Sequence, residues 1–548
     1  MNRRNFVKAT ALGTIASVGA VGCRQTDSST NKASDQAKTN SVAAFELPFE
    51  LEEATMASLQ EGMKSGKYSA RLITELYLNR IEALNRSGPA LLAIIETNPD
   101  ALKIADEIDA ERKARGPRGA LHGIPALLKD NIDTNDRMTT TAGSFALGGS
   151  IPTQDSFVAK RLREAGVVIL GKANLSEWAN FRGDVSSSGW SARGGQCRNP
   201  YVLDRSPSGS SSGSGVATSA NLCAISIGTE TDGSITAPSS HCGLVGIKPT
   251  VGLVSRAGII PIAHSQDTAG PMCRTVTDAA VLLGAITGVD RRDSATAASN
   301  GHSSNDYTQF LDPNGLRGAR IGVARKFFGF HPAVDRLMES SLDVIKKSGA
   351  ELIDLPDFFN ASQVEESELE VLLYEFKADL NAYLAGLGDK YRTLTLQGLI
   401  EFNEKNRDRE MQTYGQEIFL KAEKKGPLTD KAYLQALEKN HRLTRAEGID
   451  AAMAKHKLDA IVSPTTGPAS AIDQLNGEKY LGSTTTLAAV AGYPHITLPA
   501  GFVGELPVGI SFFGRAWSER ALIKMAFAFE QATKARRPPK FLPTLKLV

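Results

Sequence analysis

Cysteine is scarce in this chain, with five among 548 residues. No Cys-x-x-Cys pair and no His-x-x-x-His pair occurs. The sequence therefore gives no sign of a structural zinc site, whose ligands usually come in such closely spaced pairs. Apart from Cys23, the cysteines leave room for one or two disulfides, whose presence the sequence does not decide. They are Cys197, Cys223, Cys242 and Cys273.

An excess of charge of one sign is also lacking. Lys and Arg number 62 against 60 Asp and Glu, for a net charge of +2, and no long basic run occurs. Nothing here indicates a nucleic-acid-binding surface. Hydrophobic residues make up 41% and charged residues 22% of the chain. This is the balance of an ordinary folded protein, and it excludes wholesale disorder and a polytopic membrane protein.

The first 22 residues resemble an export signal. Arg3-Arg4 and Phe6 precede an uncharged run over 9–22, which is too short to span a bilayer but typical of a secretory signal. Paired arginines indicate the twin-arginine route. We therefore expect an exported protein of the periplasm or cell envelope, with residues 1–22 as signal peptide and 23–45 as a flexible tether.

Cys23 leaves two outcomes open at the end of this signal. Small residues precede it, as in a bacterial lipoprotein cleavage site, but Ala20 stands where leucine is usual. Cys23 then either carries a lipid that anchors the chain to a membrane, or follows a plain signal cleavage site.

Short apolar runs alternate with amphipathic stretches through the rest of the chain. This alternation predicts an α/β fold with a mostly parallel or mixed central sheet covered by helices on both faces. We expect one domain over 46–548, with a helical cap at about 360–480. The strand-like runs are 123–129, 167–170, 224–227, 259–260 and 321–324. The helical stretches are 155–165, 277–287, 333–347, 366–384, 407–424, 430–455 and 519–536.

Glycine is concentrated in one part of the chain, because residues 183–270 hold 14 of the 50 glycines. Within it, the block 206–250 contains a Gly/Ser-rich loop, a short helix candidate, an apolar strand and a second tight loop. Two serines, Ser210 and Ser234, sit in these two loops. A sequentially adjacent unit of this kind can fold back and bring the two hydroxyls together.

Two short motifs match known functional patterns only in part. Residues 209–213 fit the G-x-S-x-G nucleophile elbow of α/β-hydrolases, but a loop precedes them where the elbow requires a strand. Residues 166–172 fit G-x-x-x-x-G-K, but their middle residues are strand formers and no Ser or Thr follows. A buried strand explains the second motif better than nucleotide binding does.

The 206–250 block resembles the amidase signature family, and the resemblance covers nearly all of 50–540. In that family a lysine, a serine held by a cis peptide bond and a nucleophilic serine form the catalytic triad. The two serines stand 24 positions apart, as Ser210 and Ser234 do here. The family's lysine closes an apolar strand before an aspartate, as Lys129 does. The resemblance thus implies a Lys129–Ser210–Ser234 triad that needs no metal and no cofactor.

Further detail of the resemblance points to bacterial peptide amidases, which remove the C-terminal amide of peptides. Glu230 and Thr236 depart from the commoner family pattern, and the stretches Leu175–Asp184 and Leu373–Tyr383 are similar to those enzymes. The implied substrate is a small peptide amide. The alternatives are aryl, fatty acyl or cyclic amides as substrates, and a glutamine-tRNA amidotransferase component of the same family, which would need cytosolic partners.

The chemistry of amide hydrolysis explains these residue types. Serine is a weak nucleophile unless a base accepts its proton. Lysine has an ordinary pKa of about 10.4, so burial of Lys129 has to lower that pKa before it can act as the base. The turn Thr231-Asp232-Gly233 can supply backbone N–H groups to the oxyanion, with Gly209 and Ser211 supporting Ser210.

A Ser-His-Asp hydrolase is the mechanistic rival, since three histidines lie near the motifs: His122, His241 and His264. For His241 we expect a place in the pocket wall or core.

Overall fold

The computed structural model describes residues 47–356, 358–359, 361–391 and 393–546. The predicted signal peptide, Cys23 and the tether lie outside these residues. Those described belong to one compact unit. Among them, no helix combines the length and the apolar character needed to cross a membrane. The cysteines at 197, 223, 242 and 273 are buried free thiols.

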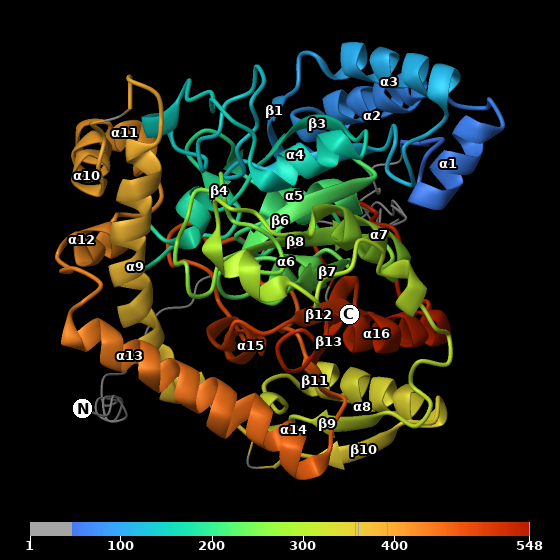
Figure 1. Cartoon of the computed structure of the whole chain (residues 1–548), viewed down its shortest axis with the longest axis vertical. Helices are drawn as coiled ribbons and strands as arrows, with labels where there is room; N and C mark the ends of the chain where they lie inside the picture. The colour runs from blue at the N-terminus through green and yellow to red at the C-terminus, as the bar shows by residue number, and fades with distance from the viewer. Residues whose placement is uncertain (1–46, 357, 360, 392, 547–548) are drawn as a thin grey trace, which may run out of the picture. The chain divides into compact units, whose positions relative to one another are not determined.

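An 11-stranded mixed sheet forms the centre of the fold, in the order β1-β3-β2-β6-β8-β7-β12-β13-β11-β9-β10 (Figure 1). This agrees with the predicted fold class. The strands are β1 (Ile94–Thr97), β2 (Pro125–Lys129), β3 (Val168–Ala173), β6 (Ile225–Glu230), β7 (Val245–Lys248), β8 (Thr268–Cys273), β9 (Arg320–Val323), β10 (Glu351–Asp354), β11 (Ala460–Pro464), β12 (His495–Val503) and β13 (Leu506–Phe513). A separate hairpin pairs β4 (Trp190–Ser191) with β5 (Gly195–Gln196).

Parallel pairing of β2 with its neighbours places the ends of these strands at one edge of the sheet. β2 pairs in parallel with both β3 and β6. All three strands are fully buried, which explains their continuous apolar runs. Since Leu128 lies opposite Ile227, the carboxyl ends of β2 and β6 reach the same edge of the sheet. This edge of an α/β sheet is where ligands usually bind.

Helices flank this sheet, and several begin at Ser or Thr side chains that accept backbone N–H bonds, as helix N-caps do. These caps are Thr55, Ser69, Ser156, Thr275 and Thr395. The helices other than the cap helices are α1 (Met56–Lys64), α2 (Ala70–Asn85), α3 (Ala101–Arg115), α4 (Phe157–Glu164), α5 (Ser212–Ser219), α6 (Thr236–His241), α7 (Val276–Ile286), α8 (Pro332–Lys347), α15 (Thr485–Ala491) and α16 (Glu519–Thr533).

The cap helices follow β10. They are α9 (Glu365–Ala385), α10 (Leu396–Lys405), α11 (Arg407–Glu410), α12 (Glu417–Glu423), α13 (Lys431–His441) and α14 (Asp450–His456), with a π-helical segment over Arg442–Ile449. Helices α9 to α12 lie at the left of Figure 1, and α13 and α14 run along its lower edge toward β9 and β10. After α14 the chain returns to the sheet as β11, so the helical region is shorter than the predicted 360–480.

Arg182 joins the cap to the loops that follow β3. Its guanidinium is fully buried, pairs with Glu177 and lies over the ring of Tyr414. It donates to the backbone carbonyls of Glu410, Tyr414 and Gly415. The Arg182 carbonyl in turn accepts the N–H groups that begin α12. Arg182 therefore connects the cap to the core through both its side chain and its backbone, in addition to bonds such as that of Tyr383 with Asp133.

One predicted strand is wrong. Ile259 and Ile260 lie in a loop, and Ile259 makes only an isolated bridge to Ile132. Pro261 follows them, and a proline cannot donate a ladder hydrogen bond.

Candidate active site

Lys129 ends β2 in a fully buried position. Its Nζ lies 2.7 Å from Ser210 Oγ and 2.8 Å from Thr229 Oγ1, at the end of the neighbouring strand β6. Burial lowers the pKa of Lys129 to about 7, although the charges of Asp267 and Glu230 oppose this shift. At neutral pH a large share of the Lys129 amines is therefore uncharged and able to accept a proton.

Ser210 is fully buried and follows a cis peptide bond from Gly209. The carbonyl of Ser210 accepts the N–H of Ser176 at 3.1 Å. A side chain at Gly209 would collide with Ser176, because a Cβ there would lie 2.2 Å from Ser176 Oγ. The close packing of this loop thus requires glycine at 209.

Ser234 reaches this pair from the other loop of the block. The N–H of Ser211 donates to the Ser234 carbonyl at 3.1 Å, so the two loops are joined next to both serines. Ser234 is 8% exposed, whereas Lys129 and Ser210 are not exposed at all. No hydrogen bond directly joins the Ser210 and Ser234 hydroxyls within the described part of the chain. The outermost group of the three is thus Ser234.

The turn before Ser234 is held by the start of α15. Thr485 Oγ1 donates to one Asp232 carboxylate oxygen at 2.5 Å, and Thr486 Oγ1 donates to the other at 2.7 Å. Gly233 adopts φ +77°, a conformation that strains other residues. The N–H groups of Thr231, Asp232 and Gly233 donate to no other group among the described residues, so they are free for a ligand.

Glu230 and Thr236, the two residues that depart from the commoner family pattern, contact each other. Glu230 accepts the N–H groups of Ile235 and Thr236 at 2.8 and 2.9 Å, and the Thr236 hydroxyl at 3.1 Å. Burial raises the pKa of Glu230, while the nearby Lys248 opposes that shift. Glu230 therefore fixes the backbone directly after Ser234.

None of the three histidines near the motifs contacts a serine of the site. His241 is buried, as expected, and one ring nitrogen lies 3.1 Å from the Gly467 carbonyl. His122 is buried against the Ile108 carbonyl, and His264 pairs with Asp379. These contacts do not support a Ser-His-Asp arrangement.

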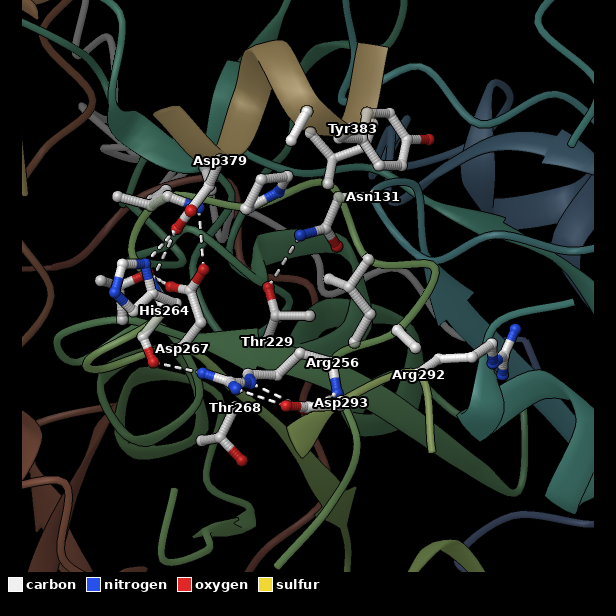
Figure 2. A pocket seen from close by; sticks show the side chains of 18 residues that line it. Asn131, Thr229, Arg256, His264, Asp267, Thr268, Arg292, Asp293, Asp379 and Tyr383 are labelled. Atoms are coloured by element: carbon white, nitrogen blue, oxygen red, sulfur yellow. Dashed lines mark hydrogen bonds and ion pairs between the residues drawn. The ribbon is translucent and has the colours of Figure 1, made fainter. Parts of the chain in front are cut away.

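A cavity of about 310 Å³ is lined by Thr229 and Asn131 (Figure 2). Lys129, Ser210 and Ser234 do not line it, but the Thr229 hydroxyl accepts bonds from both Lys129 and Asn131. Helix α9 supplies part of the wall through Asp379 and Tyr383. The predicted stretch Leu373–Tyr383 thus lines a cavity next to the site and also contributes core residues.

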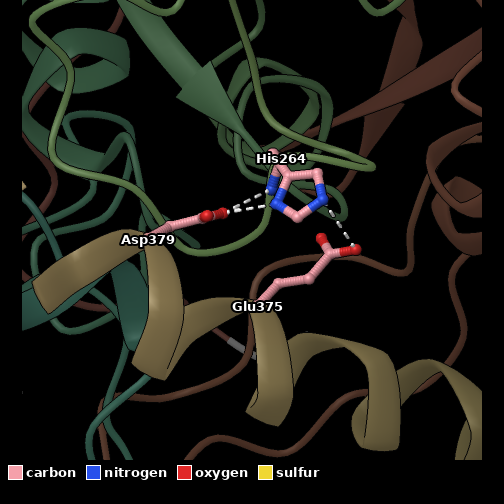
Figure 3. A group of neighbouring side chains, drawn as sticks. All are labelled: His264, Glu375 and Asp379. Atoms are coloured by element: carbon pink, nitrogen blue, oxygen red, sulfur yellow. Dashed lines mark hydrogen bonds and ion pairs between the residues drawn. The ribbon is translucent and has the colours of Figure 1, made fainter. Parts of the chain in front are cut away.

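His264 and Asp379 also line this cavity, and together with Glu375 they form a cluster (Figure 3). His264 Nδ1 lies 2.8 Å from Asp379, and Nε2 lies 3.4 Å from Glu375. The hydrogen bond to Asp379 raises the pKa of His264. Because each ring nitrogen faces a different carboxylate, the arrangement suits a protonated imidazole. A metal ion would instead need both carboxylates around one nitrogen.

Several residues around the site belong to no recognisable motif or spacing in the sequence. Thr229 binds the lysine and is itself bound by Asn131. Thr485 and Thr486 hold Asp232 from more than 250 positions away. Single hydroxyl and amide side chains are too common for their spacing to reveal such contacts. Only Thr229 was within reach of prediction, since it precedes the second loop in the same block.

Comparison with known proteins gives consistent matches. The family model described as Amidase matches residues 72–523. The solved structure of native peptide amidase from Stenotrophomonas maltophilia is 51% identical, with a TM-score of 0.85, over 90% of this chain and 100% of that one. An Arabidopsis thaliana protein described as "Probable amidase" is 45% identical over 504 residues, 90% of this chain and 93% of its own. A glutamyl-tRNA(Gln) amidotransferase component of Thermoanaerobacter pseudethanolicus is 34% identical over 510 residues, 90% of this chain and 99% of its own.

Proposed function

Since this chain belongs to the amidase signature family and is an amide hydrolase, we propose that it removes the C-terminal amide of peptides, using Ser234, Ser210 and Lys129. The observation that carries the catalytic part is the 2.7 Å contact between the buried Lys129 amine and the Ser210 hydroxyl, one loop away from the more exposed Ser234. A buried amine with its pKa near 7 is suited to act as a general base.

The acylation step moves protons inward along this row, from Ser234 to Ser210 to Lys129, and then back outward. Neutral Lys129 takes the Ser210 proton, Ser210 takes the Ser234 proton, and Ser234 Oγ attacks the amide carbonyl carbon. The tetrahedral intermediate then collapses as the C–N bond breaks. The proton returns through Ser210 to the leaving nitrogen, so ammonia departs and an ester to Ser234 remains.

The turn Thr231-Asp232-Gly233 is the proposed oxyanion hole. Its N–H groups have no other acceptor in the described residues, and Gly233 gives the turn its shape. Donors that are already fixed stabilise a developing oxyanion without reorganisation, and one such donor is worth about 10²–10³ in rate. In the second half of the reaction, water attacks the ester by the same route and releases the peptide acid.

A peptide amide as substrate is supported by similarity to the Stenotrophomonas peptide amidase, at 51% identity, against 34% for the amidotransferase component. The resemblance of the stretches Leu175–Asp184 and Leu373–Tyr383 to peptide amidases favours the same substrate. A cleft closed beyond the scissile carbonyl would admit only –NH₂ as the leaving group, since an internal bond requires room for another residue. Steric exclusion of this kind gives strong selectivity.

Mass spectrometry tests the substrate directly. We expect a tetrapeptide amide to be converted to its free acid with one ammonia released per turnover and with no shorter fragment. The same peptide as a free acid should remain intact, and acetanilide and oleamide should react at least about 100-fold more slowly. Cleavage of internal bonds, or activity confined to the aryl or fatty amide, would reject the peptide-amide substrate but leave the amidase assignment.

We also propose that the chain is exported through the twin-arginine route, on the basis of Arg3-Arg4 and the uncharged run that ends before Cys23. Replacement of both arginines by lysine should retain the protein in the cytoplasm, as cell fractionation would show. Unimpaired export of that variant would contradict the proposal. Cys23→Ser separates the two forms of the exported protein: loss of detergent partitioning indicates lipidation, and an unchanged soluble fraction indicates a plain signal cleavage.

A further inference from the structure

Gln266 and Asp267 lie directly opposite the point where the chain leaves β6. β6 and β8 are antiparallel, and Glu230 at the end of β6 pairs with Thr268 at the start of β8. In an antiparallel pair, the residue after Glu230 therefore faces the residue before Thr268. Thr231, the first residue of the proposed oxyanion turn, is thereby brought to Gln266 and Asp267.

The side-chain hydroxyl and the backbone carbonyl of Thr231 are both held by this pair. The Thr231 hydroxyl donates to Asp267 Oδ1 at 2.5 Å, and the Thr231 carbonyl accepts from Gln266 Nε2 at 3.3 Å. Thr231 and Gln266 are 7% and 1% exposed. Two bonds between Thr231 and the two successive residues that precede β8 fix both the position and the rotation of Thr231.

Asp267 and Gln266 are themselves anchored. The second Asp267 oxygen accepts the N–H groups of Ile262 and Ala263 at 2.8 and 2.9 Å. Gln266 Nε2 also donates to Glu368 of helix α9 at 3.0 Å. Asp267 is therefore bound to a loop of the core, and Gln266 is bound to helix α9 of the cap.

We propose that Gln266 and Asp267 are positioning residues for the oxyanion hole: they hold Thr231 so that the N–H groups of the turn point to the reacting carbonyl. The inference rests on the proposed function. The middle residue of the turn is already fixed, since Asp232 is bound by Thr485 and Thr486. Holding Thr231 as well prevents the peptide plane between Thr231 and Asp232 from rotating. A displacement of about 1 Å at a reacting centre can cost about 100-fold in rate.

Thr231→Val and Thr231→Ser form a matched pair for the test. Valine keeps the shape of threonine but cannot donate to Asp267, whereas serine keeps the hydroxyl. We expect Thr231→Val to lower kcat by about 30- to 100-fold with KM within about threefold of the wild type, and to lower kcat at least about tenfold more than Thr231→Ser does. Both should fold, as thermal unfolding would verify.

Inhibitor binding separates positioning of the turn from a general structural effect. A peptide aldehyde forms a tetrahedral adduct that needs the oxyanion hole, whereas the peptide acid product does not. In Thr231→Val the aldehyde should lose affinity by the same factor as kcat/KM, with product affinity nearly unchanged. Equal loss for both compounds, equal kcat for valine and serine variants, or a change confined to KM would overturn the inference. An active Ser234→Ala enzyme would instead reject the proposed function itself.

Discussion

Replacement of Ser234 by alanine is expected to lower kcat by about five to six orders of magnitude, because removal of a serine nucleophile eliminates the covalent route. Ammonia release from a peptide amide measures this loss. The Ser234 hydroxyl makes no hydrogen bond to other described residues, and its side chain is partly accessible. The variant should therefore unfold within about 2 °C of the wild type.

Ser239→Ala is the matched control for this experiment. Ser239 lies five residues later in α6, and its buried hydroxyl has no partner among the described residues. Loss of that hydroxyl should leave turnover nearly unchanged. If Ser234→Ala still released ammonia at a rate near that of the wild type, Ser234 would not be the nucleophile.

Replacement of Lys129 by methionine is expected to lower kcat/KM by about four orders of magnitude, because the serines lose their base. Methionine fills the space without placing a new charge in the buried site. In the wild type, kcat/KM should rise about tenfold per pH unit below pH 7 and level off above it, since burial lowers the pKa of Lys129 to about 7 and only the neutral amine accepts a proton.

Lys172→Met is the control for burial alone. Lys172 is equally buried on the neighbouring strand β3, but its amine donates to the Ile132 carbonyl at 2.6 Å and to Thr140 Oγ1 at 2.7 Å rather than to a serine. Its loss should lower stability without moving the pH midpoint of kcat/KM. An active Lys129→Met enzyme together with an inactive His241→Asn enzyme would favour a serine–histidine mechanism instead.

The parts of the fold that the sequence predicted well are those with strong local patterns. The runs at 123–129 and 224–227 became β2 and β6 because both strands are buried on two faces and are apolar throughout. Strands β7, β8, β12 and β13 were missed. All four contain glycine, and β8, β12 and β13 also contain proline; both residues are weak strand formers. β7 also depends on pairing with β12, which lies far along the chain.

In the site, too, features with a local sequence pattern were predictable, and contacts between distant parts of the chain were not. The spacing of Ser210 and Ser234 made their proximity predictable, and so did the position of Lys129 at a strand end. The cis bond before Ser210 was expected from the family resemblance and is present. The contacts of Asp267 with Thr231 and of Asp232 with Thr485 were not predictable, because they depend on the register of β6 against β8 and on the docking of α15.

The attachment of the cap through Arg182 has a consequence for how such enzymes diverge. Three of the groups that Arg182 binds in the cap are main-chain carbonyls, which every amino acid provides. These three main-chain bonds therefore persist when side chains in 410–415 change, provided the backbone keeps its path, whereas the contacts of the Tyr414 ring with Arg182 and of the Glu410 carboxylate with Phe145 depend on the side chains. Substitutions that adapt the cap to a new substrate would then leave the main-chain bonds to Arg182 unchanged.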